Sequence, residues 1–204
     1  MGLRVLLALP VVLFGCGAEP TDEASSVVKG EVDGMEPADP IEKLIQRLPY
    51  VSLPWTFELW EGSVPLVELS EIEQQLLAND PDQDAGVAVG LIYDPSGVKH
   101  ILWLSPADSE LPVITTFSAD GSFLRAEALV IGQCGPGPCY ECKETVRINV
   151  DLTILTTDTV TACECDSTYQ PLSTPCEHYV TIREGELTSK GVFMAPQRTV
   201  DLSR

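Results

Sequence analysis

Basic residues are scarce in this chain, and they form no run anywhere in it. The 204 residues include 12 Lys and Arg against 31 Asp and Glu, which gives a formal net charge of −19 at pH 7. A surface of this sign repels nucleic acids and anionic lipid head groups, and it favours solubility. Without a basic cluster, the chain lacks the electrostatic footprint of a nucleic-acid-binding protein. We therefore expect no nucleic-acid partner.

Motifs of the common catalytic classes are also missing. The sequence contains no Gly-x-Ser-x-Gly elbow, no Walker A loop, no His-Glu-x-x-His pair and no dinucleotide-binding fingerprint. Its two histidines, His100 and His178, have no spacing that suggests metal ligation. A Ser-His-Asp site stays open as an alternative, because such triads are assembled in space. Acidic residues are too numerous to single out a glycosidase pair, so we expect neither catalysis nor a cofactor.

The apolar run near the start of the chain is too short to cross a membrane. It extends over about ten residues, from Val5 to Phe14, behind the positively charged Arg4. A membrane-spanning helix needs roughly 20 apolar residues, so a removable signal peptide is the better interpretation. N-terminal myristoylation is not expected, because Leu6 stands where that pattern requires Ser or Thr.

The run ends in Leu13-Phe14-Gly15-Cys16, and these four residues resemble the lipobox of bacterial lipoprotein signals. The resemblance covers only the leader, and Phe14 is bulkier than the usual residue at its position. It implies that residues 1–15 are removed and that Cys16 is acylated as the first mature residue. Gly17, in place of Asp, resembles the pattern of lipoproteins sorted to the outer membrane. An ordinary secretory signal, in which Cys16 is incidental, is the alternative.

Residues 16–40 are expected to form a flexible acidic tether. Loss of the leader removes Arg4 and leaves 11 basic and 31 acidic residues, a net charge of −20. Between Gly17 and Pro40, seven acidic residues oppose Lys29 alone, and no aromatic residue is present. Such a segment buries too little apolar area to offset its ordering entropy, and its like charges extend it. The membrane is therefore expected to be bound through the lipid without help from basic residues.

Residues 41–204 are expected to form a single β-rich domain that begins with two short helices. Asp39-Pro40 provides an N-cap and a Pro at the first helical position. The second helix should start at Ser70, where Ser70 and Glu73 match a capping box, and should end at Asn79 and Pro81. The apolar residues at helical spacing are Ile41, Leu44, Ile45 and Leu48 in the first helix, and Ile72, Leu76 and Leu77 in the second.

The segment between these helices is rich in aromatic residues. It is expected to be extended and to pack in the core, with a ligand-stacking platform as the alternative. Its large apolar residues are Trp55, Phe57, Leu59 and Trp60.

From Ala85 onward the chain predicts about eight strands. No helix of crossover length separates them, so the sheets should be antiparallel. Turns are expected at residues 94–97 and at Asp120-Gly121, and Gly185 is expected to turn the last hairpin. The predicted fold class is mainly β: an antiparallel sandwich or partly closed barrel, with two short N-terminal helices and disulfide staples.

Two stretches alternate between apolar and polar residues with the period of a strand. The clearer one, residues 146–154, is predicted as one strand with an apolar and a polar face. In the other, Arg125 and Glu127 should share the face opposite the apolar residues. The apolar faces are expected to consist of Val146, Ile148, Val150, Leu152 and Ile154 in the first stretch, and of Leu124, Ala126, Ala128 and Val130 in the second.

Six cysteines follow Cys16, namely Cys134, Cys139, Cys142, Cys163, Cys165 and Cys176. An even number in an exported chain indicates three disulfides. One is expected within residues 134–142, one from Cys163 or Cys165 to Cys176, and one between the two clusters. Because Cys163 and Cys165 are two residues apart in a predicted strand, they share a face and should have different partners.

The competing interpretation of these cysteines is a metal site. Four thiolates, from Cys139, Cys142, Cys163 and Cys165, could bind zinc. A thioredoxin-like role is disfavoured because no βαβ pattern leads into Cys139-x-x-Cys142. The Pro-Cys-x-x-Cys half of a zinc-deaminase signature is also present, but its His-x-Glu half is absent.

Three alternate aspartates, Asp80, Asp82 and Asp84, resemble the start of a calcium loop. The pattern departs from that loop because Gly86 comes one residue late and Leu91 replaces the bidentate Glu. An acidic, solvated loop after a helix explains the same residues, so no metal is expected.

These features predict a lipid-anchored cell-envelope protein whose domain is a non-catalytic binding or interaction module. Its expected partner is another envelope protein or a polysaccharide. The alternative is a hydrolase of envelope or extracellular carbohydrate that uses carboxylates, and a third possibility is a metal carrier. A cleft with two carboxylates whose surroundings shift their pKa values in opposite directions would favour the hydrolase. An exposed apolar patch would favour the binding module.

Overall fold

The computed structural model describes residues 39–59, 64–79, 86–106, 110–132, 134–135 and 137–203. Two compact units, residues 1–36 and 37–204, divide the chain, and all described residues belong to the second. The predicted leader, Cys16, most of the tether, Trp60 and the three aspartates of the calcium alternative lie outside the described residues. Within the described part, no helix is long and apolar enough to cross a membrane.

Both predicted helices are present. Helix α1 (Pro40–Arg47) begins where the Asp39 side chain accepts a hydrogen bond from the Ile41 N–H at 3.0 Å. Helix α2 (Glu71–Ala78) begins where Glu73 Oε2 accepts a hydrogen bond from the Ser70 N–H at 2.7 Å. It ends at Asn79, which adopts the left-handed conformation with φ of 53°.

The inward face of α2 differs from the predicted one. Ile72 is 61 % exposed, whereas Glu73 is buried beside Leu77. The Arg47 guanidinium of α1 lies 2.7 Å from the Glu73 carboxylate, so an ion pair between the helices takes the place expected for an apolar contact. Apolar spacing alone does not reveal this partner.

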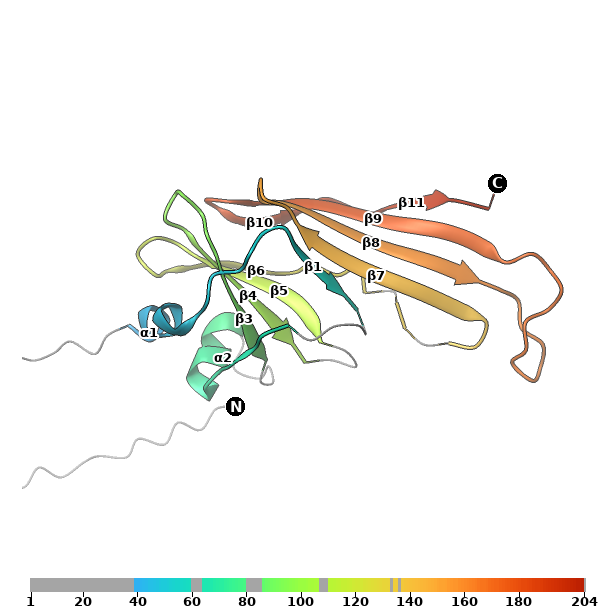
Figure 1. Cartoon of the computed structure of the whole chain (residues 1–204), viewed down its shortest axis with the longest axis horizontal. Coiled ribbons are helices and arrows are strands. Elements are labelled where there is room, and N and C mark those ends of the chain that lie inside the picture. The colour runs from blue at the N-terminus through green and yellow to red at the C-terminus, as the bar shows by residue number, and fades with distance from the viewer. Residues whose placement is uncertain are drawn as a thin grey trace, which may run out of the picture. The chain divides into compact units, whose positions relative to one another are not determined.

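Eleven described strands form two sheets, and all their pairings are antiparallel. The five-stranded sheet has the order β2 (Val67–Glu68), β3 (Val87–Ile92), β4 (Lys99–Ser105), β5 (Leu111–Phe117), β6 (Phe123–Ala128). The six-stranded sheet has the order β1 (Trp55–Glu58), β7 (Tyr140–Ile148), β8 (Thr153–Ala162), β9 (Glu177–Thr188), β10 (Gly191–Met194), and β11 (Arg198–Asp201) also pairs with β9. Figure 1 shows the two sheets and the two helices.

Two apolar clusters account for the core. One contains residues of both sheets, including Leu102 and Leu104 of β4 with Ile148 and Ile154. The other packs α1 and α2 against the opposite face of the five-stranded sheet, where Trp103 lies. Strand β4 is therefore buried on both faces, which explains its nearly continuous apolar sequence.

The mainly β class is confirmed, and the predicted core role of the aromatic segment is confirmed for Trp55, Phe57 and Leu59. The two sheets are not closed into a barrel, which corrects that alternative. No ladder joins β6 to β10 in the described part of the chain. Side chains connect the two sheets there instead, because Arg183 of β9 contacts Glu127 of β6 at 2.8 Å.

This contact shows which of the two predicted faces of β6 is the inward one. Arg125 and Glu127 are partly buried on the side that meets the other sheet, whereas Leu124 is 40 % exposed. Glu127 bonds both Arg125 and Arg183, and the Arg125 guanidinium lies 5.3 Å from the centre of the Phe193 ring. Charges are tolerated on the inward face because each has an oppositely charged or aromatic partner.

The predicted single strand at residues 146–154 is a hairpin. Strand β7 ends at Ile148 and β8 begins at Thr153, so Val150 lies in the turn with 71 % of its surface exposed. The Asn149 side chain donates to Thr153 Oγ1 at 3.0 Å, and Asp151 Oδ1 accepts the Thr153 N–H at 3.2 Å. Asn149 and Asp151, predicted on the polar face of one strand, are turn-forming residues.

Gly185 does not turn the last hairpin, which is another correction. It lies inside β9, and the turn falls at residues 189–190. A Cβ atom at position 185 would lie 2.3 Å from Met194 Sδ and 2.6 Å from the Phe193 carbonyl oxygen. Close approach of β10, and not a turn, therefore explains this glycine.

Candidate functional site: the stapled end of the long strands

Strands β7, β8 and β9 extend past the five-stranded sheet, at the end of the domain opposite α1 (Figure 1). We call this end the stapled end and define it as residues 134–142 and 163–176. Two long antiparallel pairings carry it, because β8 pairs with β7 from Ile154 to Ala162 and with β9 along its whole length. The five-stranded sheet supports only the other half of these strands.

All three disulfides lie at the stapled end, in the places expected from the sequence. Cys134 is bonded to Cys142, Cys163 to Cys176, and Cys139 to Cys165, which joins the two clusters. The four sulfurs of the zinc alternative are all bonded to sulfur and offer no set of thiolates. Cys134, Cys142 and an Asp158 oxygen lie within 4.8 Å of one another, but here too the sulfurs form a disulfide.

Hydrogen bonds within the loop between β8 and β9 stabilise it in addition to its disulfides. Asp166 Oδ1 accepts the N–H groups of Thr168 at 2.7 Å and of Gln170 at 3.0 Å. The Leu172 N–H donates to the Glu164 carbonyl at 2.8 Å. These bonds hold Tyr169 and Leu172 outward, with 69 % and 42 % of their surfaces exposed.

A hollow of about 270 Å³ lies at the base of this loop. This volume is at the lower limit of small-molecule sites, which span roughly 300–1,000 Å³. It is better matched to a side chain or a single sugar unit of a larger partner. Its lining consists of Gly137, Cys139, Tyr140, Glu141, Thr161, Cys163 and Pro171.

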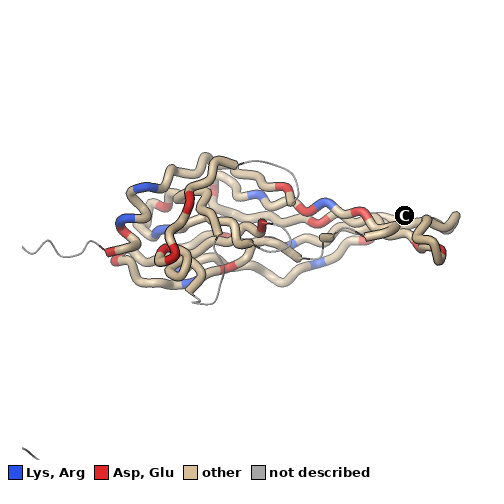
Figure 2. The backbone as a smooth tube through the Cα atoms, turned by 90° about the horizontal axis from the view of Figure 1, so that it is seen from below, with Lys and Arg blue, Asp and Glu red and all other residues tan. Residues whose placement is uncertain are grey.

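The stapled end is acidic. It carries Glu141, Glu164 and Asp166, and it contains no Lys or Arg. Figure 2 shows red positions and no blue ones over this end of the domain. A partner that docks here must tolerate or complement negative charge.

Two buried carboxylates lie beneath the stapled end. Glu144 of β7 and Asp158 of β8 are directly opposite in the register and are 1 % and 0 % exposed. Burial raises the pKa of Asp158. Burial also raises the pKa of Glu144, with a contribution from Asp158, while hydrogen bonds from the Ile131 and Gly132 N–H groups oppose the rise.

The two histidines lie apart and in different environments. His100 is fully buried between Asp94 Oδ2 at 3.1 Å and Thr116 Oγ1 at 3.0 Å. Burial lowers the pKa of His100 and outweighs the opposing effect of Asp94. This Asp-His-Thr chain is not a nucleophilic site, because Thr116 is 0 % exposed and meets no substrate. His178 is exposed and contacts Thr161 Oγ1 at 3.1 Å.

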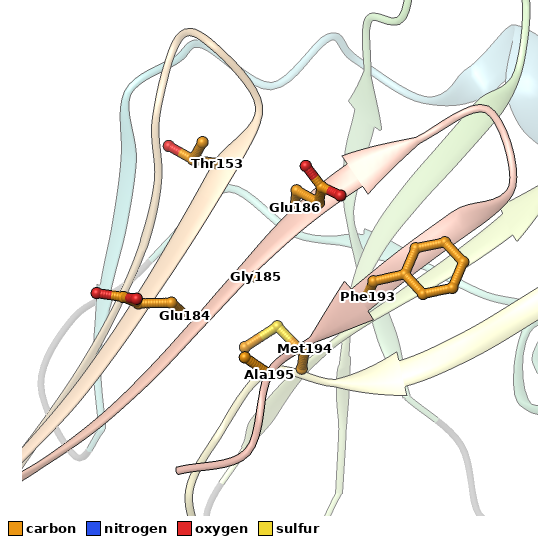
Figure 3. A pocket seen from close by; sticks show the side chains of 7 residues that line it. All are labelled: Thr153, Glu184, Gly185, Glu186, Phe193, Met194 and Ala195. Atoms are coloured by element: carbon orange, nitrogen blue, oxygen red, sulfur yellow. The ribbon is translucent and has the colours of Figure 1, made fainter. Parts of the chain in front are cut away.

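The hydrolase alternative requires a carboxylate pair in a hollow, and one such pair lies on β9. Figure 3 shows Glu184 and Glu186 on either side of Gly185, near Phe193 and Met194, in an open hollow of about 360 Å³. Both carboxylates are exposed, and Glu184 is paired with Arg198 at 3.3 Å. Because both are exposed to solvent, neither lies in the apolar environment that marks a catalytic acid.

Sequence reasoning did not single out Tyr169, Leu172, Glu144 or Asp158. For the two acids a signal exists, since each occupies an inward position of a strand among apolar residues. For Tyr169 and Leu172 the signal is weaker: two large apolar side chains in a short loop between cysteines.

Comparison of the chain with known protein families, with curated protein sequences and with solved structures finds no significant match. Its function is therefore inferred from the geometry of the described residues.

Proposed function

We propose that this protein is a lipid-anchored cell-envelope protein and a non-catalytic interaction module. In this proposal the two sheets form a β-sandwich, and the stapled end binds another envelope component. That component is a protein or a polysaccharide.

The exposed side chains of Tyr169 and Leu172, on a loop fixed by disulfides, carry this proposal. Tyrosine is enriched among the residues that dominate binding energy at interfaces. A loop that is already ordered loses less conformational entropy when a partner binds. Cys163–Cys176 closes the loop, and Cys139–Cys165 ties it to the residue that precedes β7.

The location of the stapled end supports the same proposal. The chain enters the domain at α1, and the stapled end lies at the opposite end (Figure 1). With a lipid on Cys16 and an acidic tether before α1, the stapled end is the part of the domain farthest from the entering chain. It is therefore the part best placed to meet a partner.

Photo-crosslinking in the native envelope tests the proposed binding surface. Tyr169 and Tyr93 are each replaced by a photoreactive phenylalanine analogue, and the adducts are identified by mass spectrometry. Tyr93 is a matched control, because it is 67 % exposed and lies outside the stapled end. We expect one recurrent adduct from position 169 and none of that mass from position 93. Equal adducts from both positions, or adducts only from position 93, would contradict the proposal.

A further inference from the structure

Glu144 and Asp158 are the two most deeply buried acids of the described residues, and they face each other across β7 and β8. Glu144 and Asp158 begin a row of polar residues that crosses the sheet from strand to strand. Thr181 of β9 is opposite Asp158, and Thr199 of β11 is opposite Thr181. Thr181 Oγ1 and Thr199 Oγ1 bond each other at 3.1 Å. Neither oxygen of Asp158 has a hydrogen-bond partner among the described residues.

The two acids differ in what surrounds them. Glu144 accepts hydrogen bonds from the Ile131 N–H and, at 3.4 Å, from the Gly132 N–H, which stabilise its ionised form. Asp158 has no such donors, and a buried carboxylate without partners takes up a proton instead of remaining charged. Of the two acids, Asp158 is therefore the one that favours a bound proton, whereas the ionised form of Glu144 is stabilised by its two donors.

The hydrogen bonds to Glu144 hold a segment of the chain over this part of the sheet. We call residues 129–132 the covering segment. Thr156 Oγ1 donates to its Leu129 carbonyl at 2.6 Å, and Arg183 donates to its Val130 carbonyl at 3.2 Å. Two residues after the covering segment, Cys134 is bonded to Cys142 of β7. The acid pair therefore lies between these contacts and the first disulfide of the stapled end.

We propose that Glu144 and Asp158 form a proton-operated clasp, which holds the covering segment closed while Asp158 is protonated and releases it when that proton is lost. Ionised Asp158 would place a second negative charge in a buried site opposite Glu144. Opening of the covering segment admits water to both carboxylates and relieves this repulsion. Regulation of partner binding by the clasp rests on the proposed function of the stapled end, but the clasp itself does not.

Among the described residues near the pair, no other titratable group supplies a balancing positive charge. Tyr140 of β7 and Tyr179 of β9 bond each other, and burial, Tyr179 and the two carboxylates raise the pKa of Tyr140. Arg183 of β9 is engaged by Glu127 at 2.8 Å as well as by the covering segment. Asp201 of β11 is exposed and acidic.

The covering segment itself has no ionisable side chain. Within the described part of the chain, no local counter-ion offsets the repulsion between the two acids, and a proton is what relieves it.

The direction of the pH effect follows from the raised pKa of Asp158. Asp158 binds its proton more tightly in the closed state of the covering segment than in the open state. Its protonation therefore stabilises the closed state at pH values below the ordinary aspartate pKa. This contribution is lost as the pH rises through the raised value. We therefore expect the covering segment to open toward alkaline pH.

Hydrogen exchange of the Ile131 and Gly132 amides, corrected for intrinsic exchange rates, tests the clasp in the complete folded protein. Between the ordinary pKa and the raised pKa of Asp158, each opening releases one proton, so the protection factor falls about tenfold for each pH unit. Asp158→Asn keeps the shape of the side chain without the charge, and it should remove this slope. Asp151→Asn, at an exposed turn position, should keep it.

A carbon-13 NMR titration of the Asp158 carboxyl in the unaltered protein covers the case in which Asp158→Asn does not fold. We expect that carboxyl to titrate above the ordinary aspartate value of about 3.9. Titration in the ordinary range, or an unchanged slope in Asp158→Asn, would overturn the clasp. These measurements need no partner, so their failure is distinguishable from a failure of the crosslinking experiment.

Discussion

Polar and charged residues inside this domain are each explained by a particular neighbour. Glu127 lies on an inward face because Arg183 meets it from the other sheet at 2.8 Å. Thr115 is fully buried because its hydroxyl accepts the Trp103 indole N–H at 3.0 Å and donates to the Leu77 carbonyl at 2.6 Å. Asp158 is the exception among the described residues, and its missing partner makes a bound proton the simplest account.

Gly185 offers a test of packing at the same scale. In Gly185→Ala the new methyl group would overlap Met194 and the Phe193 carbonyl, and we expect a loss of about 1–3 kcal/mol in the free energy of unfolding. Gly135→Ala is the control, since a Cβ there has nothing within 4 Å. Urea denaturation midpoints measure both variants. Equal midpoints would show that β10 does not approach β9 as closely as described.

Among the elements, the hairpin of β7 and β8 shows how a turn can be hidden in an alternating sequence. Residues 146–154 satisfy the strand period throughout, yet the chain reverses at residues 149–152. Asn149 and Asp151 stabilise the reversal through bonds to Thr153. The period places side chains on faces, but it does not say where a strand ends.

Two valines of this hairpin distinguish it from a continuous strand. Val146 is 1 % exposed and Val150 is 71 % exposed. Val146→Ala should lower the free energy of unfolding by roughly 2 kcal/mol, because buried methyl groups are lost. Val150→Ala should change it by less than about 0.5 kcal/mol. Comparable losses in the two variants, measured by chemical denaturation, would favour one uninterrupted strand.

At the scale of the whole molecule, the apolar core and the disulfides stabilise opposite halves of the domain. The core lies where the two sheets and the helices meet, while all three disulfides lie at the stapled end. A small closed loop stabilises by restricting the unfolded chain, by about 3 kcal/mol for 15 residues. Covalent links thus replace packing where the long strands extend beyond the second sheet.

The anchor is the whole-molecule prediction that lies outside the described residues. Cys16→Ser should move the protein from the membrane fraction to the soluble extracytoplasmic fraction, because the acyl chains provide the anchoring energy. Gly17→Asp is the matched control, since it should keep the lipid and change only the membrane in which the protein is found. Fractionation with metabolic labelling by palmitate measures both variants. Membrane retention of Cys16→Ser without label would contradict the lipoprotein interpretation.

The sequence by itself determined the features that depend on neighbouring residues. Asp39 and Ser70 mark where the helices begin, Asp120-Gly121 marks a hairpin, and the spacing of six cysteines indicated where the three disulfides form. Caps, tight turns and short closed loops are set by local geometry, so a sequence pattern is sufficient to find them.

Only the tertiary structure decided which charges are buried and which apolar residues are exposed. Arg125 and Glu127 face inward because another sheet brings Arg183 and Phe193 to them. Glu144 is buried because residues 131 and 132, more than ten positions away, supply its hydrogen-bond donors. The energy of a buried charge depends on groups distant in sequence, and hydrophobic periodicity contains no information about them.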